Sequence, residues 1–127
     1  LVPDMTGTQT LPRLVGPDIA KELVFTGRTV TGTEAARIGL ATRLADDPRT
    51  EALQLADDIA RRNPAAIRGA KHLLDLAGQA TLEHAFAEEA RIQRSLIGSP
   101  NQTEAVQAAL AGREASFSDD RSAWARS

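Results

Sequence analysis

The sequence predicts a mainly α-helical chain, and three observations lead to this prediction. Apolar residues recur three and four positions apart along most of the 127 residues, which places them on one face of a helix. Candidate N-cap residues stand before these stretches, and glycine or proline separates most of them. With three Phe, one Trp and no Tyr, such helices must pack closely through Leu, Ile, Val and Ala.

Two helices are expected at the start of the chain. Thr6 and Gln9 have the spacing of a capping box, which predicts a short helix over residues 8–14. Pro17 suits the first turn of a second helix, and Gly27 suits its end, because glycine readily adopts the left-handed conformation found there.

A third, shorter helix is expected next. Thr31 and Glu34 form another capping box, and the helix should run through Ile38 and end at Gly39. Apolar and polar positions then alternate over residues 40–44, which predicts the only strand of the chain.

Further helices are expected over residues 48–62, 64–77, 82–97 and 100–110. Asn63 and Ser99 are N-cap candidates, each followed by a proline at the first helical position. The longest helix should face inward through five positions, which are Leu82, Phe86, Ala90, Gln93 and Ile97. Residues 118–127 are polar apart from Trp124 and are expected to form a flexible tail, with Trp124 either exposed or docked on a partner subunit.

Composition argues against several classes of protein. Fifteen basic and seventeen acidic residues give a net charge of −2, so general nucleic-acid binding is not expected. The absence of Cys excludes disulfides and thiolate chemistry. No stretch approaches the roughly 20 apolar residues that cross a bilayer. A cytoplasmic protein without membrane contact is the expectation.

Because the first residue is Leu1 and Met5 lies within a motif, a fragment, a processed chain or a truncated product is also expected.

Three segments carry a family resemblance. They are Leu-Val-Pro-Asp-Met-Thr-Gly-Thr-Gln at residues 1–9, continuing to Gly16; Thr-Gly-Arg at residues 26–28 followed by Glu-Ala and Gly-Leu at 34–35 and 39–40; and Gly-Arg-Glu-Ala-Ser-Phe at 112–117. In this order they resemble the C-terminal half of the enoyl-CoA hydratase/isomerase (crotonase) superfamily. The resemblance spans nearly the whole chain.

The resemblance implies the C-terminal part of an α/β crotonase fold, the ClpP/crotonase-like spiral of ββα units. Residues 1–45 would hold the last elements of the spiral core, and residues 46–117 a helical oligomerisation region. Such helices form a homo-trimer, often within a dimer of trimers.

The implied function is that of an acyl-CoA enzyme, which hydrates 2-enoyl-CoA or moves an enoyl-CoA double bond. Its substrate is an acyl-CoA thioester, and no cofactor is implied beyond the coenzyme A of that substrate. In the family, the two backbone N–H groups of the oxyanion hole and the two hydratase glutamates lie before the segment that matches Leu1. Losing one such donor costs about 10²- to 10³-fold in rate, so this chain alone is expected to be inactive. The alternative is a noncatalytic helical oligomerisation fragment.

Asp4 is the catalytic candidate, because the matching position carries a carboxylate in some branches of the family. A base beside a polarised thioester can move a proton between carbons. The alternative is an acid that caps the first helix.

Substrate contacts are expected at Pro3, Phe25 and Arg113. Arg113 would reach the nucleotide of coenzyme A, although Gly112 stands where some members carry Lys; a surface salt bridge is the alternative, and core packing is the alternative for Phe25. No metal site is expected, because His72 and His84 lack partners at ligand spacing.

Overall fold

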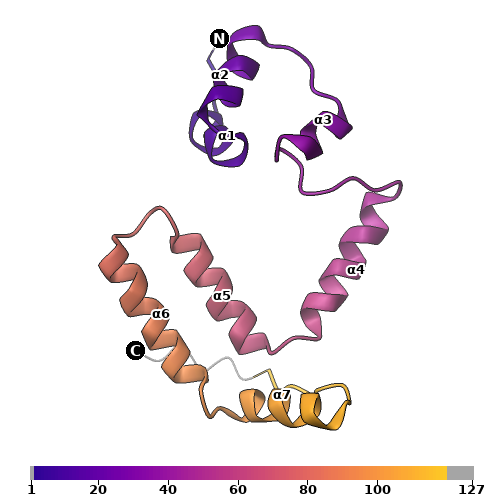
Figure 1. Cartoon of the computed structure of the whole chain (residues 1–127), viewed down its shortest axis with the longest axis vertical. Coiled ribbons are helices and arrows are strands. Elements are labelled where there is room, and N and C mark those ends of the chain that lie inside the picture. The colour runs from indigo at the N-terminus through magenta and orange to yellow at the C-terminus, as the bar shows by residue number, and fades with distance from the viewer. Residues whose placement is uncertain (1, 120–127) are drawn as a thin grey trace. The chain divides into compact units, whose positions relative to one another are not determined.

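The computed structural model describes residues 2–119, and Figure 1 shows that this part of the chain is a succession of helices. The helices are α1 (Gly7–Val15), α2 (Pro17–Thr26), α3 (Gly32–Arg37), α4 (Pro48–Ala60), α5 (Pro64–Leu76), α6 (Leu82–Leu96) and α7 (Pro100–Ala111). The predicted mainly helical class is confirmed. The chain divides into two compact units, one up to Glu51 and the other from Ala52 onward.

In the first unit, α1 and α2 pack against each other and bury Val15 and Ala20. Thr6 is the N-cap residue of α1, but the predicted capping box with Gln9 is wrong. Thr6 is left-handed, with φ of 67°, and its side chain makes no cap hydrogen bond. A side-chain cap requires an extended backbone at the N-cap residue, and here the N–H of Gln9 donates to the backbone carbonyl of Thr6 at 2.9 Å instead.

The predicted end of the second helix and start of the third are confirmed. Gly27, with φ of 60°, ends α2, and its N–H donates to the carbonyl of Leu23. The hydroxyl of Thr31 accepts a hydrogen bond from the N–H of Glu34 at 3.2 Å.

The predicted strand over residues 40–44 is wrong, since this segment is irregular and no strand occurs within residues 2–119. The N–H of Ala41 is already bonded to the carbonyl of Ala35 at 3.0 Å, at the end of α3. Just before it, Gly39 has φ of 83° and lies so close to α1 that a Cβ would be 2.9 Å from the carbonyl oxygen of Leu14. A strand needs a neighbouring strand for its backbone groups, and the described residues supply none.

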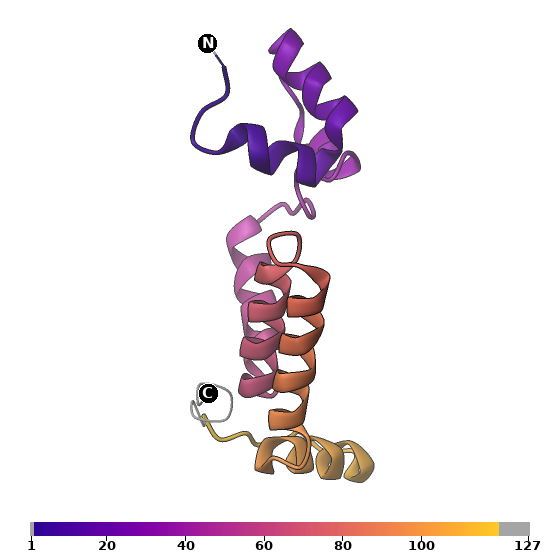
Figure 2. The same cartoon turned by 90° about the vertical axis from the view of Figure 1, so that its left-hand side faces the viewer.

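In the second unit, α5 and α6 form a helical hairpin (Figure 2). The predicted caps before α5 and α7 are confirmed. Asn63 accepts from the N–H of Ala65 at 3.0 Å, and Ser99 accepts from the N–H of Gln102 at 3.3 Å.

The predicted inward face of α6 is wrong for the described residues. Leu82, Phe86 and Ile97 are exposed, whereas Ile92 is buried. Ile92 packs against Gly69 of α5, where an added Cβ would be 2.8 Å from its Cγ2. The predicted positions therefore form an apolar stripe, but this stripe is exposed, because no other described residue covers it.

The segment after α7 is held against the helices of the second unit by hydrogen bonds and an ion pair. The buried amide of Asn101 donates to the carbonyl of Ser118 at 2.8 Å and accepts from its N–H at 3.0 Å. Glu104 accepts from the N–H of Ser116 at 2.8 Å. The carboxylate of Asp119 pairs with the guanidinium of Arg68 in α5 at 2.9 Å. Trp124 lies outside the described residues.

None of the described helices is long and apolar enough to span a membrane.

Candidate functional site

A pocket of about 180 Å³ opens between α1, α2 and the segment before α1. Its lining brings together Pro3 and Phe25, two of the residues expected to contact substrate. The wall is almost entirely apolar, and Leu11, Pro12 and Val24 supply much of it. A cavity of about 150 Å³ suffices for a benzene-sized guest, so this pocket suits a small apolar group.

The helix connection between α1 and α2 explains why these residues meet. Gly16 has φ of 85°, and Pro17 begins α2 immediately afterwards, so the two helices are joined without a longer loop. This brings the last turn of α2, with Phe25, to the same pocket as Pro3. Phe25 is 79% exposed, and an occupant of the pocket would remove part of this apolar surface from water.

Asp4 is the neighbour of Pro3 in the chain and is exposed in the segment before α1. Its carbonyl is bonded to Gly7, but its carboxylate makes no hydrogen bond or ion pair with a residue of the described range. The carboxylate therefore does not cap α1 in this structure. It remains available to a reacting group, and its catalytic role stays a prediction.

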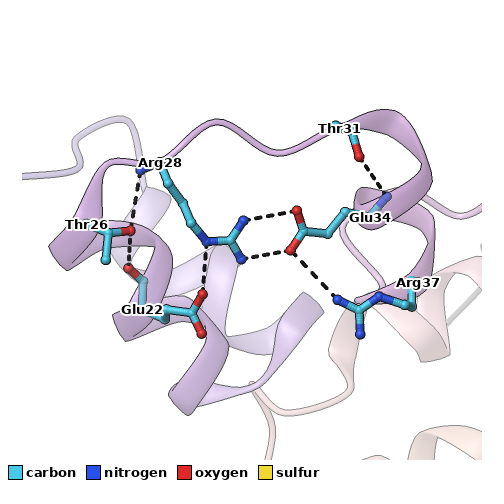
Figure 3. Close-up of polar contacts among 6 residues, drawn as sticks. All are labelled: Glu22, Thr26, Arg28, Thr31, Glu34 and Arg37. Atoms are coloured by element: carbon cyan, nitrogen blue, oxygen red, sulfur yellow. Dashed lines mark hydrogen bonds and ion pairs between the residues drawn. The ribbon is translucent and has the colours of Figure 1, made fainter.

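Arg28 connects the end of α2 to α3, as Figure 3 shows. Its Nε donates to Glu22 at 2.9 Å, and its two terminal nitrogens donate to the two carboxylate oxygens of Glu34 at 3.0 and 2.8 Å. Arg37 lies 3.7 Å from the same Glu34 carboxylate. The hydrogen bonds from Arg28 lower the pKa of Glu34, and the same contacts raise the pKa of Arg28.

Thr26, the last residue of α2, holds the backbone of Arg28 in place. The hydroxyl of Thr26 donates to the carbonyl of Glu22 at 2.7 Å and accepts from the N–H of Arg28 at 3.4 Å (Figure 3). Because Phe25 belongs to the same last turn of α2, the arginine cluster stabilises the helix end that lines the pocket. The sequence interpretation missed this cluster. Its signal in the sequence is an arginine directly after the helix end, in Thr-Gly-Arg at residues 26–28, six residues before the glutamate of Glu-Ala at 34–35.

Arg113 lies in the other compact unit. It lines a second pocket of about 490 Å³, together with Arg61 and Arg62, at the ends of α4 and α7. Its guanidinium is already engaged, since its terminal nitrogens donate to the carboxylate of Glu104 at 2.6 and 2.9 Å. This hydrogen bonding lowers the pKa of Glu104 to about 2. A phosphate of coenzyme A would therefore have to share Arg113 with this carboxylate.

The two histidines lie near a carboxylate of α6. His72 is 3.6 Å from Glu88, which also accepts hydrogen bonds from Arg91 at 2.9 to 3.2 Å. These bonds from Arg91 lower the pKa of Glu88. Within the described part of the chain, no three metal-ligating side chains come together.

Comparison with known proteins places the chain in a family. A family model described as enoyl-CoA hydratase/isomerase matches residues 1–120. The chain therefore belongs to the enoyl-CoA hydratase/isomerase family and is similar to its C-terminal half, as its sequence predicted.

Individual relatives agree with this assignment. The chain is 34% identical to the Mycobacterium tuberculosis protein named "Probable enoyl-CoA hydratase echA8", over 92% of this chain and 46% of the relative. It is 31% identical to the 2,3-dehydroadipyl-CoA hydratase of Escherichia coli, over 92% of this chain and 47% of that protein. The crystal structure of an enoyl-CoA hydratase from Bacillus anthracis matches with a TM-score of 0.86 and 30% identity, over 94% of this chain and 47% of the other. The fold is thus the helical C-terminal part of the crotonase fold, and the chain spans about half the length of these relatives.

Proposed function

We propose that the chain forms the C-terminal part of an acyl-CoA enzyme, which hydrates 2-enoyl-CoA or shifts the double bond of an enoyl-CoA. The observation that carries this proposal is the apolar pocket walled by Pro3 and Phe25, next to the exposed carboxylate of Asp4. The pocket would hold the acyl group of the thioester. The oxyanion hole would come from the half that precedes residue 1 in relatives of full length.

Asp4 would act as the base in double-bond migration. Once the thioester carbonyl is polarised, the protons on the neighbouring carbon become acidic. The carboxylate would take a proton from one carbon and return it two carbons further along the chain, so that no proton is gained or lost overall. Pro3 and Phe25 would hold the acyl group beside it, and Arg113 would bind a coenzyme A phosphate in competition with Glu104.

Replacing Asp4 by Asn in the complete enzyme tests this role. We expect the rate of 3-enoyl-CoA to 2-enoyl-CoA isomerisation to fall about 100-fold or more, because a positioned base contributes this much. The melting temperature should hardly change, because the carboxylate has no partner among the described residues. Asp46→Asn is the matched control, since Asp46 is also an exposed carboxylate of the first unit without a described partner. Unchanged turnover in Asp4→Asn would remove the catalytic role, and hydration of a 2-enoyl-CoA measured in parallel would decide between the two reactions.

A noncatalytic oligomerisation fragment is the second candidate. It is favoured by the exposed large apolar residues of the second unit, which include Leu74, Leu82, Phe86, Ile97 and Leu110. Large apolar side chains that gather in one exposed patch mark protein interfaces, and these residues are candidates for such a patch. We propose a homo-trimer, or a dimer of trimers, as the assembly in either case. A complete protein without turnover on either substrate, together with a self-associating chain, would favour this second candidate.

A further inference from the structure

Lys21 is the only charged residue that lines the pocket between α1 and α2. On a helix, residues three and four positions ahead share the same face, and for Lys21 these are Val24 and Phe25, both of which line the pocket. The aliphatic stem of Lys21 thus covers part of the apolar wall. Lysines with a stem on apolar surface generally keep the ammonium group in water at the edge of that surface.

The ammonium group of Lys21 makes no ion pair or hydrogen bond with any residue of the described range. The chain contains a contrasting case, because its other lysine, Lys71, is paired with Asp75 one turn further along α5. Two carboxylates of α2 lie near Lys21 in sequence. Asp18, one turn before it, forms no ion pair with it, and the adjacent Glu22 pairs with Arg28 at 2.9 Å instead. Among the residues that line this apolar pocket, the one cation thus has no partner in the described chain.

We propose that this pocket accepts a short acyl group that ends in a carboxylate, with Lys21 as the counter-ion. The inference rests on the proposed function and names the class of its substrate, a thioester of a short dicarboxylic acid. The aliphatic part would fill the space of about 180 Å³, which is enough for about six carbon atoms by comparison with a benzene-sized cavity.

The apolar wall makes this ion pair stronger than one in open water. Two opposite charges attract more strongly when less water surrounds them, and an occupant of the pocket excludes water from one side of the lysine. An uncharged acyl chain would fill the same space but leave the cation unpaired. A free phosphate could pair with Lys21 but would leave the apolar wall empty. Only an aliphatic chain that carries an anion would both cover the apolar wall and pair with Lys21.

Hexanoate and hexanamide test the inference, because they share one chain and differ in charge. Both would be titrated into the 127-residue chain while the NMR signals of Phe25 and Leu11 are followed. We expect hexanoate to bind about three- to fivefold more tightly than hexanamide, which is the scale of a partly exposed ion pair. Acetate, which has the charge without the chain, should give no saturable shift of these signals.

Two variants separate the pocket lysine from net charge. Lys21→Met keeps the stem and the helix propensity and should make the two ligands bind equally, while hexanamide binding stays as it was. Lys71→Met is the matched control with the same change in charge, and it should keep the preference for hexanoate. Lys21→Gln is a second neutral variant in case the first one does not fold.

The possible results distinguish this inference from the proposed function. Equal binding of the two ligands to the unchanged chain, or a preference that survives both Lys21 variants, would overturn the inference and leave the acyl pocket intact. A saturable shift with acetate would reduce the site to a simple anion site and also overturn it. If neither hexanoate nor hexanamide shifts the Phe25 signals, the acyl pocket itself is refuted, and the inference with it.

Discussion

At the scale of single residues, Arg28 of the Thr-Gly-Arg motif stabilises the end of α2 that lines the pocket. One guanidinium holds Glu22 of α2 and both carboxylate oxygens of Glu34 of α3. Paired donors in this planar geometry match a carboxylate better than a lysine could. The arginine is therefore expected to fix how α2 meets α3, and through α2 the position of Phe25.

Replacement of Arg28 by Met should lower the melting temperature by a few degrees at neutral pH, on the scale of one lost stabilising contact in a small domain. Arg37→Met is the matched control, because Arg37 reaches the same Glu34 carboxylate only at 3.7 Å and is largely exposed. That control should change the melting temperature less.

The effect of Arg28→Met should depend on pH in a defined direction. The pKa of Glu34 is lowered in the folded chain by its hydrogen bonds from Arg28. A carboxylate with a lowered pKa stabilises the fold above its ordinary pKa, and this stabilisation is lost as the pH falls through the lowered value. The difference in melting temperature between the parent and Arg28→Met should therefore be full at pH 7 and shrink in acid. A difference that grows in acid would contradict the assignment.

At the scale of the elements, α5 and α6 meet through a close contact rather than through large side chains. Gly69 leaves room for Ile92, which is one of the most buried side chains of the described chain. Alanine would gain up to about 1 kcal/mol in helix propensity over glycine. Its Cβ would, however, lie 2.8 Å from a methyl group of a β-branched residue that has little freedom to move.

Gly69→Ala should therefore destabilise the hairpin by about 1 kcal/mol or more, since overpacking costs about 1–3 kcal/mol. Urea unfolding followed by circular dichroism measures this change. In an Ile92→Ala background the methyl group is gone, so Gly69→Ala should become neutral or stabilising. Equal costs in the two backgrounds would show that the contact with Ile92 is not the cause.

At the scale of the whole molecule, the second unit has more apolar surface than its own helices cover. Leu82 and Phe86 lie one turn apart on α6 and are 73% and 65% exposed. The described residues bury Ile92 on this helix instead. In a monomer these two side chains would stay in contact with water. In the proposed trimer a neighbouring subunit would cover them.

Phe86→Glu tests the proposed assembly. We expect the variant to shift the chain from a trimer toward a monomer in sedimentation velocity, because a charge would have to be buried without a partner. Its helix content should stay unchanged, since Phe86 is largely exposed in the described chain. Ala87→Glu is the control, with the same added charge at the next exposed position of α6. Loss of association in both variants would point to net charge rather than to this surface.

The sequence by itself determined the local features of the fold. The caps at Thr31, Asn63 and Ser99 were predictable because each is a hydrogen bond between residues two or three positions apart. The end of α2 at Gly27 was predictable from the conformational freedom of glycine. Family membership was also predictable, since the matching segments extend along nearly the whole chain.

Only the tertiary structure decided which surfaces and charges meet. Periodicity marked an apolar face on α6, but burial depends on what lies opposite, and the described residues bury Ile92 against Gly69 of α5 rather than that face. Alternation suggested a strand at residues 40–44, but a strand depends on a partner that the described residues lack. The same holds for the candidate site. Pro3 and Phe25 could be named from the sequence, whereas the pocket that joins them follows from how α1 and α2 pack.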